Sequence, residues 1–238
     1  MRFTNKRVFI SGASRGIGRE IAKAFAAEGA YVIGSKTNSS LEQESVCAEW
    51  IEADFSNVDQ IEKCANYLQG LEIDIIVNNA GINKNAEFLE IIPETFLLIQ
   101  RVNVFAPFRL CQAVLPNMLE KNWGRIVNLS SIWGKISMSQ RAAYSASKFA
   151  LDGMTIALAA EFSGNGILAN CIAPGFTDTE LTHRMLGEEG IKALVGKVPA
   201  KRLGNVVEIA ELVLWLSSNQ NSFITGQNIA IDGGFTRV

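Results

Sequence analysis

Short runs of apolar and β-branched residues alternate along the chain with longer stretches in which apolar residues recur every three or four positions. The short runs predict buried strands, and the longer stretches predict amphipathic helices. The predicted strands are 7–11, 31–35, 50–54, 74–79, 124–130, 168–173 and 228–232, of which 50–54 is the weakest. The predicted helices are 18–29, 59–70, 94–121, 143–162 and 206–218.

This alternation predicts an α/β fold. Strands joined by helices form right-handed crossovers, which build a doubly wound parallel sheet of about seven strands with helices on both faces. No linker, repeat or low-complexity segment divides residues 1–238, so we expect a single domain. The segment at about 176–204 follows a strand and is rich in Gly, Thr and charge, and we expect it to be an irregular, flexible lid over the substrate.

The composition excludes several classes of protein. Of the 238 residues, 48% are hydrophobic and 19% are charged, and the net charge of −2 does not suggest a nucleic-acid-binding surface. No stretch reaches the roughly 18 apolar residues of a membrane span, and the N-terminus does not resemble a signal peptide. The four cysteines (Cys47, Cys64, Cys111 and Cys171) are scattered, which predicts reduced, buried thiols in a cytoplasmic protein. The one histidine, His183, is expected on the surface, and a multi-histidine metal site is impossible.

Residues 12–18, which read GASRGIG, follow the first predicted strand and open the first predicted helix. Gly12 permits a tight turn, Gly16 lets the backbone approach a pyrophosphate, and Gly18 lets the helix pack close to the sheet. The N–H groups at the helix start favour negative charge. We therefore expect a dinucleotide to bind this turn, through Gly12, Ser14, Arg15, Gly16, Ile17 and Gly18.

The end of the second strand, GSKTNSS at 34–40, lacks the acidic residue that binds the ribose 2′-hydroxyl of NAD(H). Lys36 stands there instead, and Arg15 in the glycine turn is within reach of the same place. Hydroxyls are offered there by Ser35, Thr37 and Ser39. Because Lys and Arg attract a 2′-phosphate, we favour NADP(H) over NAD(H). The alternative is that both cations face water.

Residues 144–148 read YSASK. On a helix, Tyr144 and Lys148 lie one turn apart on the same face, with small residues between them. This pair is either an acid–base couple or an ordinary surface pair, and the motif alone does not decide between the two.

Together with NNAG at 78–81 and NLSS at 128–131, these motifs resemble the classical short-chain dehydrogenase/reductases. The resemblance runs from about residue 5 to the C-terminus, through APG at 173–175 and IDGG at 231–234. Within that family the chain is most similar to the 3-oxoacyl-[acyl-carrier-protein] reductases, through VPAKRLG, ITGQ and GAYVIGSKT. The resemblance implies a Rossmann-type fold and an NADP(H)-dependent oxidoreductase that interconverts a carbonyl and a secondary alcohol by hydride transfer.

The resemblance also implies residue roles. The catalytic residues would be Asn103, Ser131, Tyr144 and Lys148, with Tyr144 and Lys148 also contacting the cofactor. Further cofactor contacts would come from the adenine positions Asp54 and Phe55, from Asn79 and Gly81 in NNAG, and from Thr177 and Thr179 near the nicotinamide.

The chemistry fits these residue types. The Lys148 ammonium would favour the Tyr144 phenolate and so lower the pKa of Tyr144. Lowering that pKa by about three units requires about 4 kcal/mol of stabilisation of the phenolate relative to the phenol. Tyr144 then serves as acid in reduction and base in oxidation, while Ser131 stabilises charge on the substrate oxygen. Asn103 would anchor a proton-relaying water, and Asn103 and Pro107 together predict a local deformation of their helix.

The substrate stays open. In the resembling reductases, arginines that dock the acidic carrier protein lie near the site entrance, before the fifth and sixth strands. Asn122 and Asn165 stand at those positions here, with Lys121 and Arg125 as basic neighbours. A 3-oxoacyl thioester is therefore one candidate, with acyl-carrier protein as partner. A different alcohol or ketone, such as a sugar derivative or secondary metabolite, is another, and a non-catalytic nucleotide-binding protein is a third.

Two further expectations concern packing. Trp133 and Met138 either form an apolar wall of the substrate pocket or belong to the core. The helical stretches 94–121 and 145–163 are apolar over much of their circumference, which is typical of helices shared with a partner. The family resemblance implies that they pair into a four-helix interface of a homotetramer.

Overall fold

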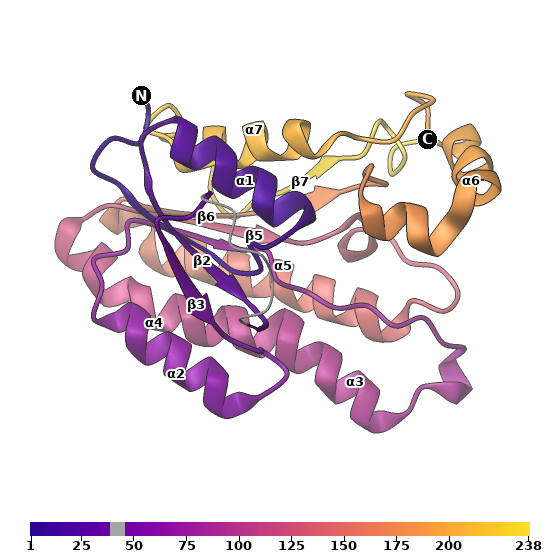
Figure 1. Cartoon of the computed structure of the whole chain (residues 1–238), viewed down its shortest axis with the longest axis horizontal. Coiled ribbons are helices and arrows are strands. Elements are labelled where there is room, and N and C mark those ends of the chain that lie inside the picture. The colour runs from indigo at the N-terminus through magenta and orange to yellow at the C-terminus, as the bar shows by residue number, and fades with distance from the viewer. Residues whose placement is uncertain (39–45) are drawn as a thin grey trace.

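The computed structural model describes residues 1–38 and 46–238, so Ser39 lies outside the described part of the chain. Its centre is a seven-stranded parallel sheet with the strand order β3-β2-β1-β4-β5-β6-β7 (Figure 1). The predicted α/β class, the parallel sheet and all seven predicted strands are confirmed. The strands are β1 (Arg7–Ile10), β2 (Tyr31–Lys36), β3 (Glu49–Glu52), β4 (Ile75–Asn78), β5 (Gly124–Leu129), β6 (Ile167–Pro174) and β7 (Asn228–Ile231).

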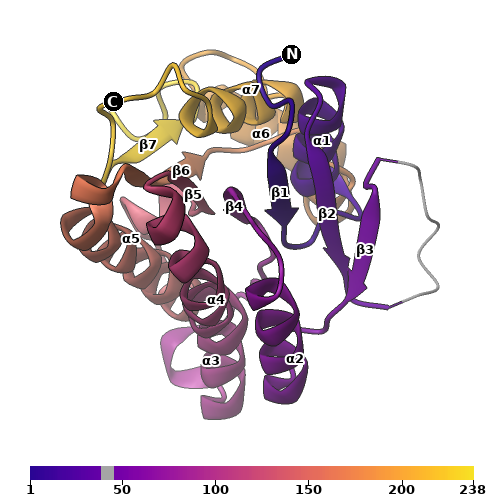
Figure 2. The ribbon, with the colours of Figure 1, turned by 90° about the vertical axis from the view of Figure 1, so that its left-hand side faces the viewer.

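Helices cover both faces of the sheet (Figures 1 and 2). The helices are α1 (Gly16–Ala27), α2 (Val58–Gln69), α3 (Pro93–Gln100), α4 (Ala106–Lys121), α5 (Ala142–Phe162), α6 (Glu180–Lys197) and α7 (Val206–Ser217). Figure 2 shows α1 and α7 on one face, and α2, α4 and α5 on the other.

The central strands are apolar throughout because both of their faces are buried. Phe9 of β1 packs into the core beneath α2 and α4, among residues such as Leu68 and Val114. Its neighbours Val8 and Ile10 point to the opposite face, into the core that α1 and α7 share. Each strand therefore joins two hydrophobic cores, and this explains why its sequence lacks a polar–apolar alternation.

The predicted helix at 94–121 is two helices joined by a π-helical segment, Arg101–Phe105. This confirms the deformation expected around Asn103. A π-bulge widens the helix by one residue and is common at functional sites.

The segment 176–204 differs from the prediction of irregular structure. It contains α6, an 18-residue helix that bends at Gly187, whose φ is +61°. Sequence patterning missed α6 because apolar residues do not recur regularly along it, and none of its described side chains is buried.

The carboxyl ends of the parallel strands meet at one edge of the sheet, so the loops that follow β1, β2, β4, β5 and β6 gather there. The chain reverses its strand order between β1 and β4, and in such sheets a crevice opens at this switch point. Among the described residues, no helix has the length and apolar character that crossing a membrane requires.

Candidate active site

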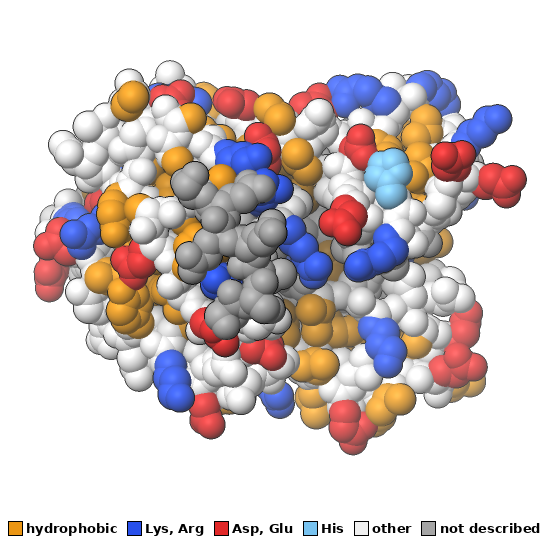
Figure 3. Space-filling model, in the orientation of Figure 1, with side chains coloured by type: hydrophobic (Ala, Val, Ile, Leu, Met, Phe, Trp, Pro, Cys, Tyr) orange, Lys and Arg blue, Asp and Glu red, His pale blue; other side chains and the backbone are white. Residues whose placement is uncertain are grey.

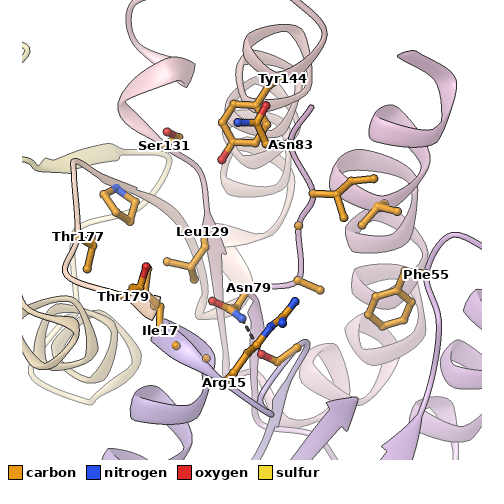
Figure 4. Close-up of a pocket in the computed structure, with 18 of the residues that line it drawn as sticks. Arg15, Ile17, Phe55, Asn79, Asn83, Leu129, Ser131, Tyr144, Thr177 and Thr179 are labelled. Carbon is orange, nitrogen blue, oxygen red and sulfur yellow. Dashed lines mark hydrogen bonds between the residues drawn. The ribbon is translucent and has the colours of Figure 1, made fainter. Parts of the chain in front are cut away.

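A cavity of about 690 Å³ lies at the carboxyl edge of the sheet (Figure 4). Every residue expected at the site lines it except Asn103. The expected residues that line it are Gly12, Ser14, Arg15, Gly16, Ile17, Gly18, Lys36, Thr37, Asp54, Phe55, Asn79, Gly81, Ser131, Tyr144, Lys148, Thr177 and Thr179. In Figure 4, Arg15 and Phe55 lie at one end of the cavity, while Ser131 and Tyr144 lie at the other.

The glycine turn is fastened to β4 by one side chain. The amide Nδ2 of Asn79 donates hydrogen bonds to the carbonyls of Ser11 and Gly12, each at 3.0 Å, and one of these bonds is drawn in Figure 4. A Cβ on Gly18 would lie 2.3 Å from the Gly12 oxygen and 2.4 Å from Asn79 Nδ2. Gly18 is thus required by this contact as well as by the approach of helix to sheet.

The end of β2 supplies the charge for the far end of the cavity. Lys36 is largely buried, with Nζ 5.8 Å from the centre of the Trp50 ring, whereas Arg15 is exposed at the N-cap of α1. The Ser35 hydroxyl accepts from Gly12 N at 3.0 Å, so it holds the turn. The Asp54 carboxylate accepts from Ser56 N at 2.9 Å, beside Phe55 in the cavity wall.

At the other end, Tyr144 and Lys148 project from the first turns of α5. The Lys148 Nζ lies 5.5 Å from the centre of the Tyr144 ring and donates to the Leu129 carbonyl at 2.7 Å. Ser131 lies two residues after β5 and caps the short helix Ile132–Gly134 by accepting from Trp133 N. A Cβ on Gly81 would stand 3.6 Å from Lys148 Nζ, so the absence of a side chain there keeps this part of the cavity open.

The electrostatics of the pair differ from the expectation. Burial raises the pKa of Tyr144, while the Ser131 hydroxyl and the charge of Arg141 act in the opposite direction. Burial lowers the pKa of Lys148 to about 8. Desolvation of the phenolate is the largest effect on Tyr144, and Lys148 is not among the groups that lower its pKa here. At neutral pH this site holds Tyr144 as a phenol, the form that can donate a proton.

Asn103 stands behind the cavity rather than in its wall. It is fully buried in the π-helical segment, where Nδ2 donates to the Ile82 carbonyl and to Ser147 Oγ, and Oδ1 accepts from Ile82 N. Ser147 Oγ in turn donates to the Tyr144 carbonyl at 2.7 Å. A chain of hydrogen bonds therefore links the loop after β4 to the helix that carries Tyr144.

The small residues of YSASK do more than leave space. Ser145 and Ser147 are both buried. Ser145 Oγ accepts from Ser137 Oγ at 2.8 Å, and Ser147 bonds Asn103. Both hydroxyls fasten α5 to its surroundings, and helical spacing alone gives no signal for such a role.

Several lining residues have no sequence motif. Arg141, three residues before Tyr144, is one of them. Four more come from the loop after β4 and from the start of α6, namely Asn83, Glu180, Thr182 and Arg184. The lid was expected over the site, but its individual contacts depend on α6, which the sequence pattern did not reveal.

A rim clasp joins the loop after β4 to the loop before α5. Arg141 Nη1 donates to Asn85 Oδ1 at 2.7 Å, and Gln140 Nε2 donates to Glu87 Oε1 at 2.7 Å. The Ala86 N–H also donates to the Gln140 carbonyl, at 3.4 Å. We use the name rim clasp for these contacts between residues 85–87 and 140–141.

Of the two residues expected in an apolar wall, only Trp133 lines the cavity. It packs edge-on against Phe176 and Phe235. Met138 is 56% exposed and lies outside the cavity, so the expectation for it is wrong. His183 is exposed as predicted and pairs with Asp178 at 2.6 Å.

The positions linked to carrier-protein docking lie elsewhere. Asn122 ends α4 just before β5, and Asn165 precedes β6, so both lie at the amino ends of their strands, opposite the cavity. The expectation that these positions flank the entrance of this chain's own site is therefore wrong. Arg125 is buried, with its guanidinium bonded to the carbonyls of Gly124, Gly166 and Asn221. Lys121 pairs with Glu72 and Asp74.

The chain is similar to known proteins in both sequence and structure. The family model described as enoyl-(acyl carrier protein) reductase matches residues 12–236. The 3-oxoacyl-[acyl-carrier-protein] reductase FabG of Escherichia coli (strain K12) is 36% identical over 247 residues, covering all of both chains. A solved structure described as a short chain dehydrogenase/reductase family protein is 31% identical with a TM-score of 0.92, covering all of both chains. A gluconate 5-dehydrogenase from Burkholderia cenocepacia J2315, solved with NADP and tartrate, is 30% identical with a TM-score of 0.91, covering 100% of this chain and 97% of that one.

Gly18→Ala tests the fastening of the glycine turn. The new methyl group meets a backbone oxygen that cannot move alone, so we expect the free energy of unfolding to fall by about 1–3 kcal/mol. Urea unfolding followed by circular dichroism measures this.

Gly196→Ala is the matched control. A Cβ on Gly196 meets nothing within 4 Å, and the residue is helical, so this variant should be neutral or more stable by up to about 1 kcal/mol. Equal stability of the two variants would show that the Asn79 contact does not constrain Gly18.

Proposed function

Because this chain belongs to the short-chain dehydrogenase/reductase family, we propose that it transfers a hydride between NADP(H) and a substrate carbonyl or secondary alcohol. It is an oxidoreductase, in agreement with the class expected from the sequence. The observation that carries the proposal is the convergence of Ser131, Tyr144 and Lys148 on the cavity that also contains the glycine turn. A protein that only bound a nucleotide would not need this trio, so the non-catalytic alternative is disfavoured.

The residues present fit NADP(H). The turn at Gly12 and Gly16 has positive φ angles of 66° and 57°, which leave its backbone free of side chains toward the cavity. Lys36 and Arg15 supply positive charge at the end where the 2′-phosphate would lie, and no acid follows β2 directly. The solved relative with NADP supports the same cofactor. When bound, the cofactor supplies or accepts the hydride.

The chain's own residues would handle the proton. In reduction, Tyr144 Oη donates its proton to the substrate oxygen as the carbonyl carbon gains the hydride, and in oxidation it accepts that proton back. Its raised pKa keeps the phenol protonated, which suits the reductive direction. The Ser131 hydroxyl would donate a hydrogen bond to the same oxygen and stabilise its developing charge.

We assign supporting roles to Lys148, which would stabilise the Tyr144 phenolate, and to Asn103, which positions neighbouring groups. Lys148 is buried and 5.5 Å from the Tyr144 ring, so its ammonium would stabilise the phenolate left after proton transfer. Asn103 has both amide hydrogens engaged by Ile82 and Ser147, which fits a positioning role for its side chain. The remaining contacts proposed from the sequence would hold the cofactor, and all of them line the cavity: Asp54, Phe55, Asn79, Gly81, Thr177 and Thr179.

The first substrate candidate is a 3-oxoacyl thioester, supported by the similarity to the carrier-protein reductases. A different ketone or alcohol, such as a sugar derivative, is favoured by two specific observations. A solved relative at 30% identity is a gluconate 5-dehydrogenase, and asparagines stand at two positions where the resembling carrier-protein reductases have arginines. Acyl-carrier protein is thus the weaker of the proposed partners.

We also propose a cytoplasmic homotetramer. The four cysteines are free and buried, which fits a reducing compartment. The exposed face of α4, the π-helical segment before it and α5 carry large apolar side chains, namely Phe105, Phe108, Phe149 and Ile156. Exposed aromatic groups gathered in this way are typical of an interface between subunits.

A first assay follows NADPH oxidation at 340 nm with acetoacetyl-CoA, simple ketones and sugars, with NADH as the comparison. We expect turnover with NADPH in part of this panel. Tyr144→Phe keeps the ring and removes the proton donor, and we expect its turnover to fall by about 10²–10⁴. Bound NADPH should still be detected by its fluorescence in this variant. Retention of most of the activity by Tyr144→Phe contradicts the proposed chemistry.

Lys36→Gln tests the cofactor preference. Loss of the cation should lower kcat/KM for NADPH by about tenfold or more, equivalent to about 1.4 kcal/mol, and leave kcat/KM for NADH nearly unchanged. Lys23→Gln on the exposed side of α1 is the matched control and should change neither value. An unchanged NADPH-to-NADH ratio in Lys36→Gln means that Lys36 does not bind the 2′-phosphate.

Light scattering at micromolar concentration tests the assembly. We expect a mass near four times the 25.9 kDa of one chain. Phe149→Glu, which places a charge on the exposed face of α5, should reduce this mass, whereas Val58→Glu at the start of α2 should not. A monomer mass for the unmodified protein rules the tetramer out.

A further inference from the structure

Arg141 is a charged residue of the cavity that has no part in the chemistry described above. Arg141 immediately precedes α5 and stands three residues before Tyr144, so the two side chains share one face of the first turn. Its guanidinium carbon lies 5.4 Å from the centre of the Trp133 ring, which follows Ser131 in the cavity wall. Arg141 is therefore beside the reacting end of the cavity rather than the glycine turn.

The guanidinium is only partly used by the protein. Arginine has five N–H donors, and Arg141 spends Nη1 on Asn85 in the rim clasp. Within residues 1–38 and 46–238, no carboxylate lies within 4.0 Å of it. The remaining donors belong to a side chain that borders the cavity.

An incompletely paired guanidinium in this position is costly for the protein. The side chain is half-buried, and burial lowers the pKa of Arg141, while an ionised Tyr144 raises it. With no carboxylate of the described chain beside it and donors left over, a partly desolvated guanidinium at the cavity is suited to bind an anion there. A guanidinium matches a carboxylate in shape and binds it through two parallel hydrogen bonds.

The other charges of the cavity separate by position. Arg15 lies at the end opposite Tyr144, and Lys36 follows β2, where both would meet cofactor phosphates (Figure 4). The acids in the lining are Asp54, engaged by Ser56 N, and Glu180 at the start of α6. Arg184 of α6 is a further cation in the lining. Basic side chains also border the hollow seen on this face in Figure 3.

We propose that the substrate is a small carboxylic acid, a hydroxy acid or its oxo acid, whose carboxylate is bound by Arg141. This rests on the proposed oxidoreductase function and names its substrate class. The carboxylate takes no part in bond making: a hydride adds to the carbonyl carbon, the Tyr144 proton goes to its oxygen, and the acid group stays ionised. A thioester is neutral next to its carbonyl and would leave the Arg141 charge unbalanced.

The experiment compares pairs of substrates that differ only in charge. Acetoacetate and methyl acetoacetate are tested for reduction with NADPH, and D-gluconate and D-glucitol for oxidation with NADP⁺. We expect the acid of a pair that reacts to exceed its neutral counterpart at least tenfold in kcat/KM. Arg141→Gln should abolish this preference by raising KM for the acid, and Arg141→Lys should retain part of it.

Binding provides a readout that does not depend on turnover. The enzyme with NADP⁺ is titrated with acetoacetate, D-gluconate and tartrate, and the thermal midpoint is recorded for the unmodified protein and for Arg141→Gln. Stabilisation by an acid, lost in Arg141→Gln, supports the proposal. Arg109→Gln, a remote arginine paired with Glu62 on the surface, is the control and should behave as the unmodified protein.

The outcomes distinguish the carboxylate assignment from the oxidoreductase function on which it rests. Equal use of acid and neutral substrate, or a preference for the acid that survives in Arg141→Gln, overturns the carboxylate assignment and leaves the oxidoreductase function intact. Absence of both turnover and stabilisation with every acid also overturns it. Failure of NADPH oxidation with every carbonyl compound, including those of the broader panel, contradicts the oxidoreductase function itself.

Discussion

The reversal of strand order between β1 and β4 is the constraint on which the site depends. The chain runs from β1 outward to β3 and then returns to the other side of β1, so the loops that follow β1 and β4 leave the sheet in opposite directions. The space between them becomes the crevice that holds the glycine turn. Asn79, the first residue after β4, bridges this gap to the carbonyls of Ser11 and Gly12 and so fixes the width of the crevice.

A second set of hydrogen bonds links this region to the end of the cavity that contains Tyr144 and Lys148. The π-helical segment moves Asn103 into a position where one amide meets both the Ile82 backbone and Ser147. Ser147 lies on the same helix as Tyr144 and Lys148. Tyr144, the proposed proton donor, is thereby positioned relative to the loop after β4, and Asn79 directly after β4 also fastens the glycine turn.

The sequence was sufficient for the sheet and for the residues carried by motifs, since seven buried strands and the glycine turn leave strong local patterns. Sequence patterns did not reveal features that depend on contacts between distant parts of the chain. Helix α6 bends at Gly187, and none of its described side chains is buried, so no regular apolar pattern marks it. Arg141 has no motif of its own, and its proposed role depends on the approach of Trp133 and on the cavity. The burial that raises the pKa of Tyr144 could not be read from the sequence, because it is a property of the folded site.

The rim clasp fixes part of the cavity wall and so limits what the cavity can hold. Three hydrogen bonds hold residues 85–87 against 140–141, so the cavity has one wall that is fixed by its own contacts. The start of α6 also lines the cavity, through Glu180, Thr182 and Arg184, and no such set of hydrogen bonds joins these three residues to residues 85–87 or 140–141. The clasp therefore fixes the spacing between the loop after β4 and Arg141, and the size of the group that fits beside Arg141 depends on these three hydrogen bonds.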